Sequence, residues 1–171
     1  MYILIMKFLI RKGTINDCAT VARLVTFAWN ETYKGIVPNC ILKKLKTNEE
    51  ESATNLIKNL ELNNFYQLVL EVNGKIVGFV NYGKTSDTDF NDCGEIIALY
   101  ILKDYQGKGL GKKLFENAYF ELEKMGFKKI IIACLKGNPA NDFYIHMGGK
   151  YIKDGIFARL NLKENIYLFE K

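Results

Sequence analysis

The sequence DYQGKGLGKKL, residues 104–114, places three glycines at alternate positions and surrounds them with lysines. A β-rich apolar run precedes this stretch and an amphipathic helical pattern follows it, so the glycines lie in a strand-to-helix turn. The first turn of a helix presents N–H groups without intrahelical partners and the positive end of the helix dipole. The stretch therefore predicts an anion-binding turn, and a plain turn with solvated lysines is the structural alternative.

Two familiar phosphate-binding loops differ from this stretch in their spacing. A Walker loop needs G-x-x-x-x-G-K and then Ser or Thr, whereas Gly111 and Lys112 are followed here by Lys113, with no glycine five positions before Gly111. A dinucleotide fingerprint needs G-x-G-x-x-G early in a βαβ unit, whereas this chain has G-x-G-x-G after a hairpin. Neither loop is present.

The rest of the chain surrounds the turn with alternating strand and helix patterns. In the first half of the chain we expect a strand at 3–12, a helix at 15–33 capped by Thr14, helical turns at 42–45, a helix at 49–62 and two strands at 65–83 joined by Asn73-Gly74. In the second half we expect a strand at 95–102, a helix at 110–125, a strand at 128–135, a short helix at 138–147 and strands at 150–160 and 164–171. We summarise this order as strand, two helices, three strands, helix, strand, helix and two strands. It predicts a mixed α/β sheet.

Composition favours one ordinary globular domain, spanning residues 1–171 without a linker or repeat. The chain has 171 residues, of which 49% are hydrophobic and 25% charged. Its formal net charge of +5 suits an anionic ligand as readily as nucleic acid. Because the basic residues form no clustered stripe with interleaved aromatics, we rank a nucleic-acid partner low.

Cysteine spacing and hydropathy indicate the setting. The four cysteines are far apart, with no C-x-x-C pair, so we expect buried thiols in a reducing compartment and no metal site. Lys7 interrupts the apolar N-terminal run, and no segment approaches the roughly 20 apolar residues of a membrane span. We therefore expect a cytoplasmic protein without a membrane partner.

The spacing Q-x-x-G-x-G, formed by Gln106, Gly109 and Gly111, resembles the pyrophosphate loop of the GNAT acyltransferase superfamily, which binds acetyl-coenzyme A. The element order also resembles that of GNAT proteins over nearly the whole chain. A third likeness is NPANDFYIHMGG, residues 138–149, which resembles the family segment N-x-A-x-x-F-Y-x-x-x-G. The resemblance implies the GNAT fold, a mixed and mostly antiparallel sheet flanked by helices.

The resemblance also implies how acetyl-coenzyme A would be held. Its expected contacts are the backbone of Gln106, Gly107, Lys108, Gly109, Leu110, Gly111 and Lys112 for the pyrophosphate, Leu99, Tyr100 and Ile101 for the pantetheine arm, and Asn138 and Asn141 as further contacts. The activity that this implies is acetyl-coenzyme A-dependent N-acetylation of an amine.

Acetylation of an amine requires a base, because an amine of pKa near 10.4 is neutral in only about one molecule per thousand near pH 7.4. By resemblance Glu95, eleven residues before Gln106, is the candidate, although a free Glu is too acidic and needs burial or a water relay. Water as the base and an ordinary strand-end carboxylate are the alternatives. Tyr144 is the candidate O–H donor to the departing thiolate, with a core tyrosine as its alternative.

The stretch AWNETYKGIVP, residues 28–38, resembles the segment that many relatives fold over the acceptor. Trp29, Glu31 and Tyr33 could hold a cationic amine by charge and cation–π contact. Trp29 and Tyr33 lie four residues apart, so a shared buried helix face is an equal alternative. The acceptor stays open between a polyamine, an amino acid, a small antibiotic-like amine and a protein N-terminus.

The sequence also permits a function without catalysis. The domain could bind acyl-coenzyme A without turnover, as a sensor or interaction module, although the presence of Glu95 and Tyr144 favours an enzyme. Cys134 could act as an acyl carrier. A homodimer is as open as a monomer.

Overall fold

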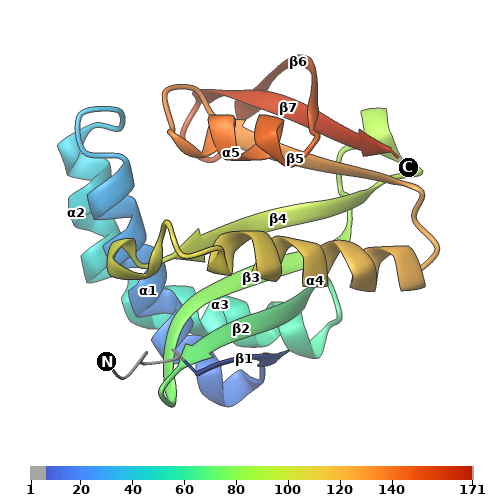
Figure 1. Ribbon diagram of the computed structural model, residues 1–171. Coiled ribbons are helices and arrows are strands. Elements are labelled where there is room, and N and C mark those ends of the chain that lie inside the picture. The colour runs from blue at the N-terminus through green and yellow to red at the C-terminus, as the bar shows by residue number, and fades with distance from the viewer. Residues whose placement is uncertain (1–6, 171) are drawn as a thin grey trace, which may run out of the picture.

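A seven-stranded sheet of order β1-β2-β3-β4-β5-β7-β6 forms the centre of the molecule (Figure 1). The structure is a computed structural model that describes residues 7–170. Its strands are β1 (Phe8–Lys12), β2 (Tyr66–Val72), β3 (Lys75–Lys84), β4 (Gly94–Ile101), β5 (Lys129–Leu135), β6 (Lys150–Phe157) and β7 (Leu162–Glu170). Every neighbouring pair is antiparallel except β4 and β5. The predicted mixed, mostly antiparallel sheet is confirmed.

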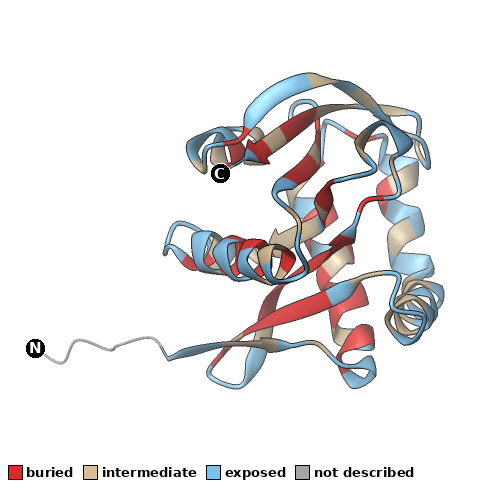
Figure 2. Cartoon of the chain, turned by 90° about the vertical axis from the view of Figure 1, so that its right-hand side faces the viewer, coloured by how far each residue is buried: buried red, intermediate tan, exposed pale blue. Residues whose placement is uncertain are grey.

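Helices cover both faces of this sheet (Figure 2). They are α1 (Cys18–Thr32), α2 (Asn39–Thr47), α3 (Glu49–Glu61), α4 (Leu110–Lys124) and α5 (Ala140–His146). Helix α1, with α3 beside it, packs on one face of β3, and α4 packs on the other. Helix α5 packs against β5 and β7. The buried side chains of α4 are Leu110, Leu114, Phe115, Ala118, Tyr119 and Leu122, which form one apolar stripe as the amphipathic pattern predicts. Met125, the last residue of the predicted helix, lies just after α4 and is 43% exposed.

Two expectations about the N-terminal third need correction. The first helical turn, Ile15–Asp17, is a 3-10 helix that leads into α1. The predicted order counted two helices before the hairpin, whereas the described residues form three. Helix α2 is separate because Pro38 starts it and Asn48, with φ −111° and ψ 20°, divides it from α3. The described strand begins at Phe8, and the predicted strand residues 3–6 lie outside the described residues.

The predicted turn at Asn73-Gly74 is confirmed as a two-residue hairpin loop. Both residues have positive φ, 52° and 75°, while Val72 pairs with Lys75. Asn and Gly adopt this left-handed conformation more readily than other residues, which explains the strength of the sequence signal.

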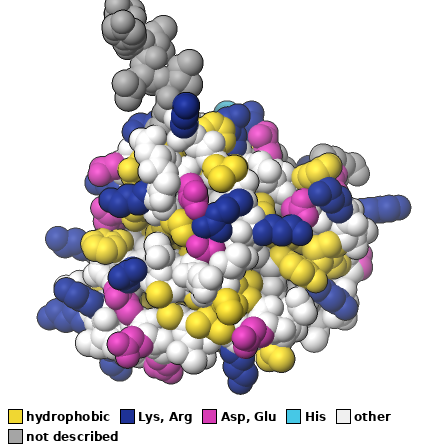
Figure 3. Space-filling model, turned by 90° about the horizontal axis from the view of Figure 1, so that it is seen from below, with side chains coloured by type: hydrophobic (Ala, Val, Ile, Leu, Met, Phe, Trp, Pro, Cys, Tyr) yellow, Lys and Arg dark blue, Asp and Glu magenta, His cyan; other side chains and the backbone are white. Residues whose placement is uncertain are grey.

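The cysteines are free, but they are not uniformly buried. Cys18, Cys93 and Cys134 are buried, whereas Cys40 is exposed, contrary to our expectation for it. Within residues 7–170, no group of three or more His, Cys, Asp or Glu side chains could hold a metal ion. None of the helices in this described part is both long enough and apolar enough to cross a membrane. On the face shown in Figure 3, basic and acidic side chains are interspersed.

Arg11 joins the first strand to the start of α1 and to β2. Its guanidinium donates to Asp17 at 2.8 Å and to Glu71 at 2.7 Å, and the Thr14 backbone N–H also donates to Asp17, at 2.8 Å. The pKa of Asp17 is lowered from 3.8 to about 2, mainly by the hydrogen bond from Arg11 and to a smaller extent by that from Thr14. Because the folded-state pKa lies below the ordinary value, the stabilisation is present above pH 3.8 and is lost as the pH falls toward 2.

We therefore expect Asp17→Asn to lower the free energy of unfolding by about 2 kcal/mol at neutral pH. The loss of stability between about pH 4 and pH 2 should be smaller in the variant than in the parent protein. Urea unfolding across this pH range measures both effects. Asp92→Asn is the control, because Asp92 is exposed and lies 3.7 Å from Lys129, and such pairs contribute little. Equal stability of Asp17→Asn and the parent at neutral pH would contradict this account.

Candidate functional site

The glycine-rich turn predicted from the sequence connects β4 to α4. Gly107 and Gly109 have φ of 70° and 74°, and Gly109 is the N-cap of α4. This left-handed conformation disfavours residues with a Cβ, so the backbone itself explains these two glycines.

Gly111 has a different explanation. It lies inside α4, its φ is not in the left-handed range, and a Cβ placed there would meet only Ile101 Cδ1 at 3.6 Å and Phe143 at 3.9 Å. These are ordinary contacts. Glycine inside a helix costs about 1 kcal/mol relative to alanine, so neither space nor conformation favours it here. A glycine at this position would allow an external ligand to approach the backbone closely.

Donors and positive charge surround Gly111. Lys113 N–H donates to Gly109 O at 3.2 Å, so the preceding N–H groups of α4 lie before the first intrahelical bond. Lys112 is exposed, with Glu116 3.9 Å away. Gln106 instead donates to Ile101 O at 2.8 Å, which fixes the turn to the end of β4. The arrangement suits the diphosphate of a coenzyme.

Strands β4 and β5 diverge next to this turn (Figure 1). They pair only at Gly94 with Ile130 and at Glu95 with Ile131. Pairing between β3 and β4 shifts register around Ile97, a bulge that leaves this side chain 41% exposed. Beyond the bulge, the edge of β4 that faces β5 pairs with no described strand. The predicted pantetheine contacts on this edge are Leu99, Tyr100 and Ile101, which pair with β3 on their other side. An open strand edge offers backbone groups to an extended ligand.

Tyr144 lies on α5 and is buried, at 5% exposed. Its ring lies 5.3 Å from that of Phe143 and 6.5 Å from that of Phe115, measured between centroids. The pKa of Tyr144 is raised well above its ordinary value of 10, mainly because the residue is buried and to a smaller extent because Cys134 and Tyr100 lie nearby. The phenol therefore stays protonated at neutral pH and is suited to donating a hydrogen bond.

Asn138 and Asn141 make hydrogen bonds within the protein. Asn138 Nδ2 donates to Tyr33 Oη at 2.8 Å, and Asn138 Oδ1 accepts from Ala140 N–H at 2.9 Å. Asn141 Nδ2 donates to two carbonyls, while its Oδ1 accepts from Asn165 and Tyr167. Because the donors and acceptors of Asn141 are all occupied, a structural role is favoured for it. Their contacts with the cofactor stay predictions.

Glu95 is half-buried on β4, and other carboxylates lie near it. Burial and the charge of Asp87 raise the pKa of Glu95, against a hydrogen bond from Thr85 that lowers it. Burial and the charges of Glu95 and Asp87 also raise the pKa of Glu164 on β7. A raised pKa makes Glu95 a better base than a free glutamate.

The three residues predicted to hold the acceptor do not share one environment. Trp29 and Tyr33 are buried, and their ring centroids lie 4.6 Å apart. They pack in a cluster with Val37, Leu42 and Leu135, as the alternative of a shared buried helix face predicts. Glu31 is exposed on α1. A role for all three in binding the acceptor stays a prediction.

Cys134 is a poor candidate for an acyl carrier. Burial and the charge of Glu164 raise the pKa of its thiol to about 12. The thiolate, which is the nucleophilic form, is therefore scarce at neutral pH.

Solved structures with this fold include N-acetyltransferases. The PaiA N-acetyltransferase of Thermoplasma acidophilum, solved in complex with coenzyme A, has a TM-score of 0.79 at 20% identity, covering 97% of this chain and 100% of that one. An acetyltransferase of Thermus thermophilus has a TM-score of 0.73 at 20% identity and covers 100% of both chains.

The family model of the acetyltransferase (GNAT) family matches residues 21–148, and the chain belongs to this family. An uncharacterized N-acetyltransferase of Bacillus subtilis, YuaI, is 25% identical over 91% of this chain and 88% of its own length. The L-amino acid N-acyltransferase MnaT of Escherichia coli is 25% identical over 80% of this chain and 75% of its own length.

Sequence reasoning did not single out Asp87 or Glu164. They lie 8 and 69 positions from Glu95 in the chain, and the polar loop and terminal strand that carry them have no motif. Only the sheet order, which places β7 beside β5, brings Glu164 close enough to influence Glu95.

Proposed function

We propose that this protein transfers an acetyl group from acetyl-coenzyme A to a primary amine by direct attack of the amine. The observation that carries the proposal is the turn at residues 106–112. There Gly111 leaves the backbone bare at the positive end of α4, although the fold itself does not require a glycine at this position. Membership of the GNAT family supports the same reaction class.

The proposed binding mode assigns the cofactor to the turn and the open edge. The N–H groups at the start of α4 and the charge of Lys112 would hold the diphosphate, and the backbone of residues 99–101 would hold the pantetheine arm. When bound, acetyl-coenzyme A supplies the acetyl group as a thioester. The residues of this chain position it, remove a proton from the amine and stabilise the sulfur that leaves.

Glu95 is the proposed base. Its burial and the neighbouring charge of Asp87 bring its pKa closer to the operating pH, which improves proton transfer from an ammonium or through a water. The carboxylates of Glu95, Asp87 and Glu164 also favour a cationic acceptor on this side of the sheet.

The proposed acceptors are small amines, namely polyamines, amino acids and antibiotic-like amines, or a peptide N-terminus. One relative is named an L-amino acid N-acyltransferase, so amino acids belong on a test panel. Glu31, exposed at the end of α1, would attract the cation, and the neighbouring Trp29 and Tyr33 would shape that end of the site. The free cysteines favour a reducing compartment, which supports a cytoplasmic enzyme.

We expect Tyr144→Phe to lower turnover about tenfold to a thousandfold while cofactor affinity changes little. The hydroxyl would act on charge that develops as the thiolate leaves, whereas the buried ring packs the same way in both proteins. Steady-state rates, with chemistry shown to limit turnover, and calorimetry measure the two quantities. Tyr151→Phe on β6 is the control, because Tyr151 is 55% exposed. Equal turnover of Tyr144→Phe and the parent would assign this tyrosine to packing.

A coenzyme A release assay over a panel of amines tests the proposed function itself. We expect release that depends on both enzyme and amine. A binding module or sensor, the second candidate, would bind acetyl-coenzyme A in calorimetry and release none with any amine. That result would contradict the proposal.

A further inference from the structure

A buried hydrogen bond joins the end of α1 to the start of α5. Asn138 Nδ2 donates to Tyr33 Oη at 2.8 Å, across 105 positions of the sequence. Tyr33 is 3% exposed and Asn138 is 8% exposed. A second contact joins the same segments, because a Cβ placed on Gly137 would lie 3.7 Å from the Ile36 side chain. The segment 28–38, which was predicted to fold over the acceptor, therefore lies against the loop between β5 and α5.

Asn138 organises the start of α5. Its Oδ1 accepts from the Ala140 N–H at 2.9 Å, and its backbone C=O accepts from the Asn141 N–H at 3.0 Å. Its own N–H donates to Leu135 O at 3.1 Å, which fixes the loop to the end of β5. The amide holds Ala140 only while its oxygen faces the helix, because a flipped amide would place a donor there. Tyr33 accepts from the nitrogen of this amide and so fixes its orientation.

The Tyr33 hydroxyl is suited to this task because it stays neutral. Its pKa is raised above the ordinary value of 10, mainly by burial and to a smaller extent by the neighbouring Tyr100, while the hydrogen bond from Asn138 lowers it slightly. A neutral hydroxyl can both accept and donate a hydrogen bond. The Tyr33 ring is held separately, with its centroid 4.6 Å from that of Trp29.

The position of Tyr144 depends on how α5 is held. Tyr144 lies about one helical turn after Ala140, the residue that donates to Asn138. Helix α5 has only 7 residues, and so short a helix is held by its surroundings and not by its own hydrogen bonds. At its far end, the Gly149 N–H donates to Tyr144 O at 2.9 Å. The contacts at the start of α5 therefore help to set the direction of the phenol.

We propose that Tyr33 is a positioning residue, whose hydroxyl holds the Asn138 amide and thereby the start of α5, so that Tyr144 faces the departing thiolate. This inference rests on the proposed function, which gives Tyr144 its role. It assigns the Tyr33 hydroxyl to the geometry of the reaction and not to direct binding of the amine.

Tyr33→Phe tests the proposal, because it removes the hydroxyl and keeps the ring that packs in the core. We expect turnover to fall about tenfold, since a misplaced catalytic group lowers the rate. The Michaelis constant for the amine should change less than about twofold. Direct binding of the amine by this hydroxyl would give the reverse, a raised Michaelis constant at unchanged turnover, and that result would overturn the proposal.

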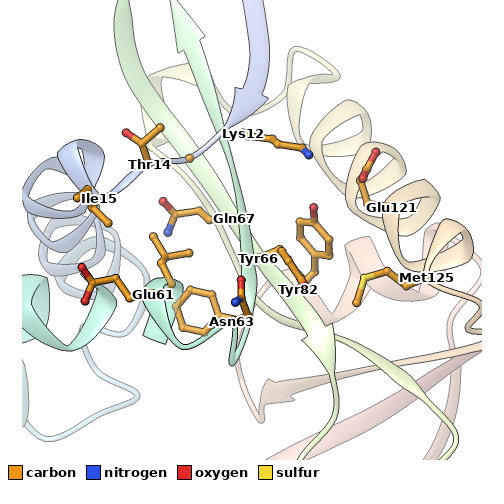
Figure 4. A pocket seen from close by; sticks show the side chains of 13 residues that line it. Lys12, Thr14, Ile15, Glu61, Asn63, Tyr66, Gln67, Tyr82, Glu121 and Met125 are labelled. Atoms are coloured by element: carbon orange, nitrogen blue, oxygen red, sulfur yellow. The ribbon is translucent and has the colours of Figure 1, made fainter. Parts of the chain in front are cut away.

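Tyr82→Phe is the control for this variant. Tyr82 is also 3% exposed, so the control removes a hydroxyl from an equally buried tyrosine. It lines a groove at the start of β2, and none of the residues that line this groove belongs to the candidate active site (Figure 4). We expect the turnover of Tyr82→Phe to equal that of the parent.

A double-mutant cycle tests whether Tyr33 acts through Tyr144. If it does, Tyr33→Phe should lower turnover about tenfold in the parent, but less than about twofold in a protein that already carries Tyr144→Phe. Equal losses in both backgrounds would overturn the proposal. Turnover of Tyr33→Phe equal to that of the parent would also overturn it.

Hydrogen exchange measured by NMR tests the structural step without any turnover. The N–H groups of Ala140 and Asn141 both donate to Asn138, so they should exchange at least about tenfold faster in Tyr33→Phe than in the parent. The Gly13 N–H, which donates to Gln67 O at 2.8 Å, is the internal control and should keep its rate. Unchanged exchange at Ala140 and Asn141 would overturn the proposal. If the parent releases no coenzyme A with any amine, the proposed function fails, whereas the exchange rates still decide whether Tyr33 holds the start of α5.

Discussion

Gly111→Asp is expected to weaken acetyl-coenzyme A binding at least about a hundredfold, because a carboxylate at the start of α4 would face the coenzyme diphosphate in a partly desolvated site. The variant should still fold. Gly111 has no left-handed φ, a Cβ fits at 3.6 Å from Ile101, and an acidic residue in the first turn of a helix is favourable. Isothermal titration calorimetry measures the affinity, and thermal unfolding checks the fold.

Two control variants separate charge from shape and from general electrostatics. Gly111→Ala adds a side chain without charge and should bind acetyl-coenzyme A within a few-fold of the parent. Asn117→Asp adds the same charge at an exposed position further along α4, and it should also bind normally. Gly109→Asp should abolish binding too, but its φ of 74° strains any side chain, so it is the less direct test. Unchanged affinity in folded Gly111→Asp would remove this turn from the cofactor site.

Glu95→Gln should lower the turnover number about a hundredfold near neutral pH, the usual scale for loss of a general base. Turnover by the parent should rise as pH increases through the raised pKa of Glu95, because only the carboxylate accepts a proton. The variant lacks this group. Its turnover should instead recover partly at high pH, where more of the amine is already neutral.

Glu31→Gln is the comparison for this experiment, because the two glutamates are assigned different work. Glu31 is exposed on α1, so its loss should chiefly raise the Michaelis constant for cationic acceptors and should not be rescued by pH. Full pH profiles of both variants with one active amine separate the two roles. If the profile of Glu95→Gln superimposes on that of the parent, Glu95 is not the base.

Local features of the fold could be predicted from the sequence because their chemistry is local. Asn73, Gly74, Gly107 and Gly109 have conformations that few other residues adopt, so their residue types alone indicated the two turns. Helix α2 was harder to recognise. Its separation from α3 depends on one residue, Asn48, within a continuous polar stretch that is typical of a helix.

Features that depend on packing could not be predicted in the same way. The spacing of Trp29 and Tyr33 fits an acceptor clasp as well as a buried face, and only the fold places them in the core beside Leu135. The carboxylates near Glu95 come from residues that are distant in the sequence and that the order of the strands brings together. The environment of the buried Gln67 oxygen likewise depends on packing. Local sequence patterns predict neither feature. The structure also shows why Gly111 differs from its neighbours, which the sequence spacing did not.

The most direct test of the account is a single-turnover reaction with acetyl-coenzyme A that carries an isotopically labelled acetyl group, using an amine that gives coenzyme A release. Mass spectrometry of the quenched mixture locates the label. Direct attack predicts that the label moves to the amine nitrogen as an amide, at the same rate as free coenzyme A forms, and that the protein stays unlabelled. Label on Cys134 before it reaches the amine, or label recovered only as acetate, would contradict the account.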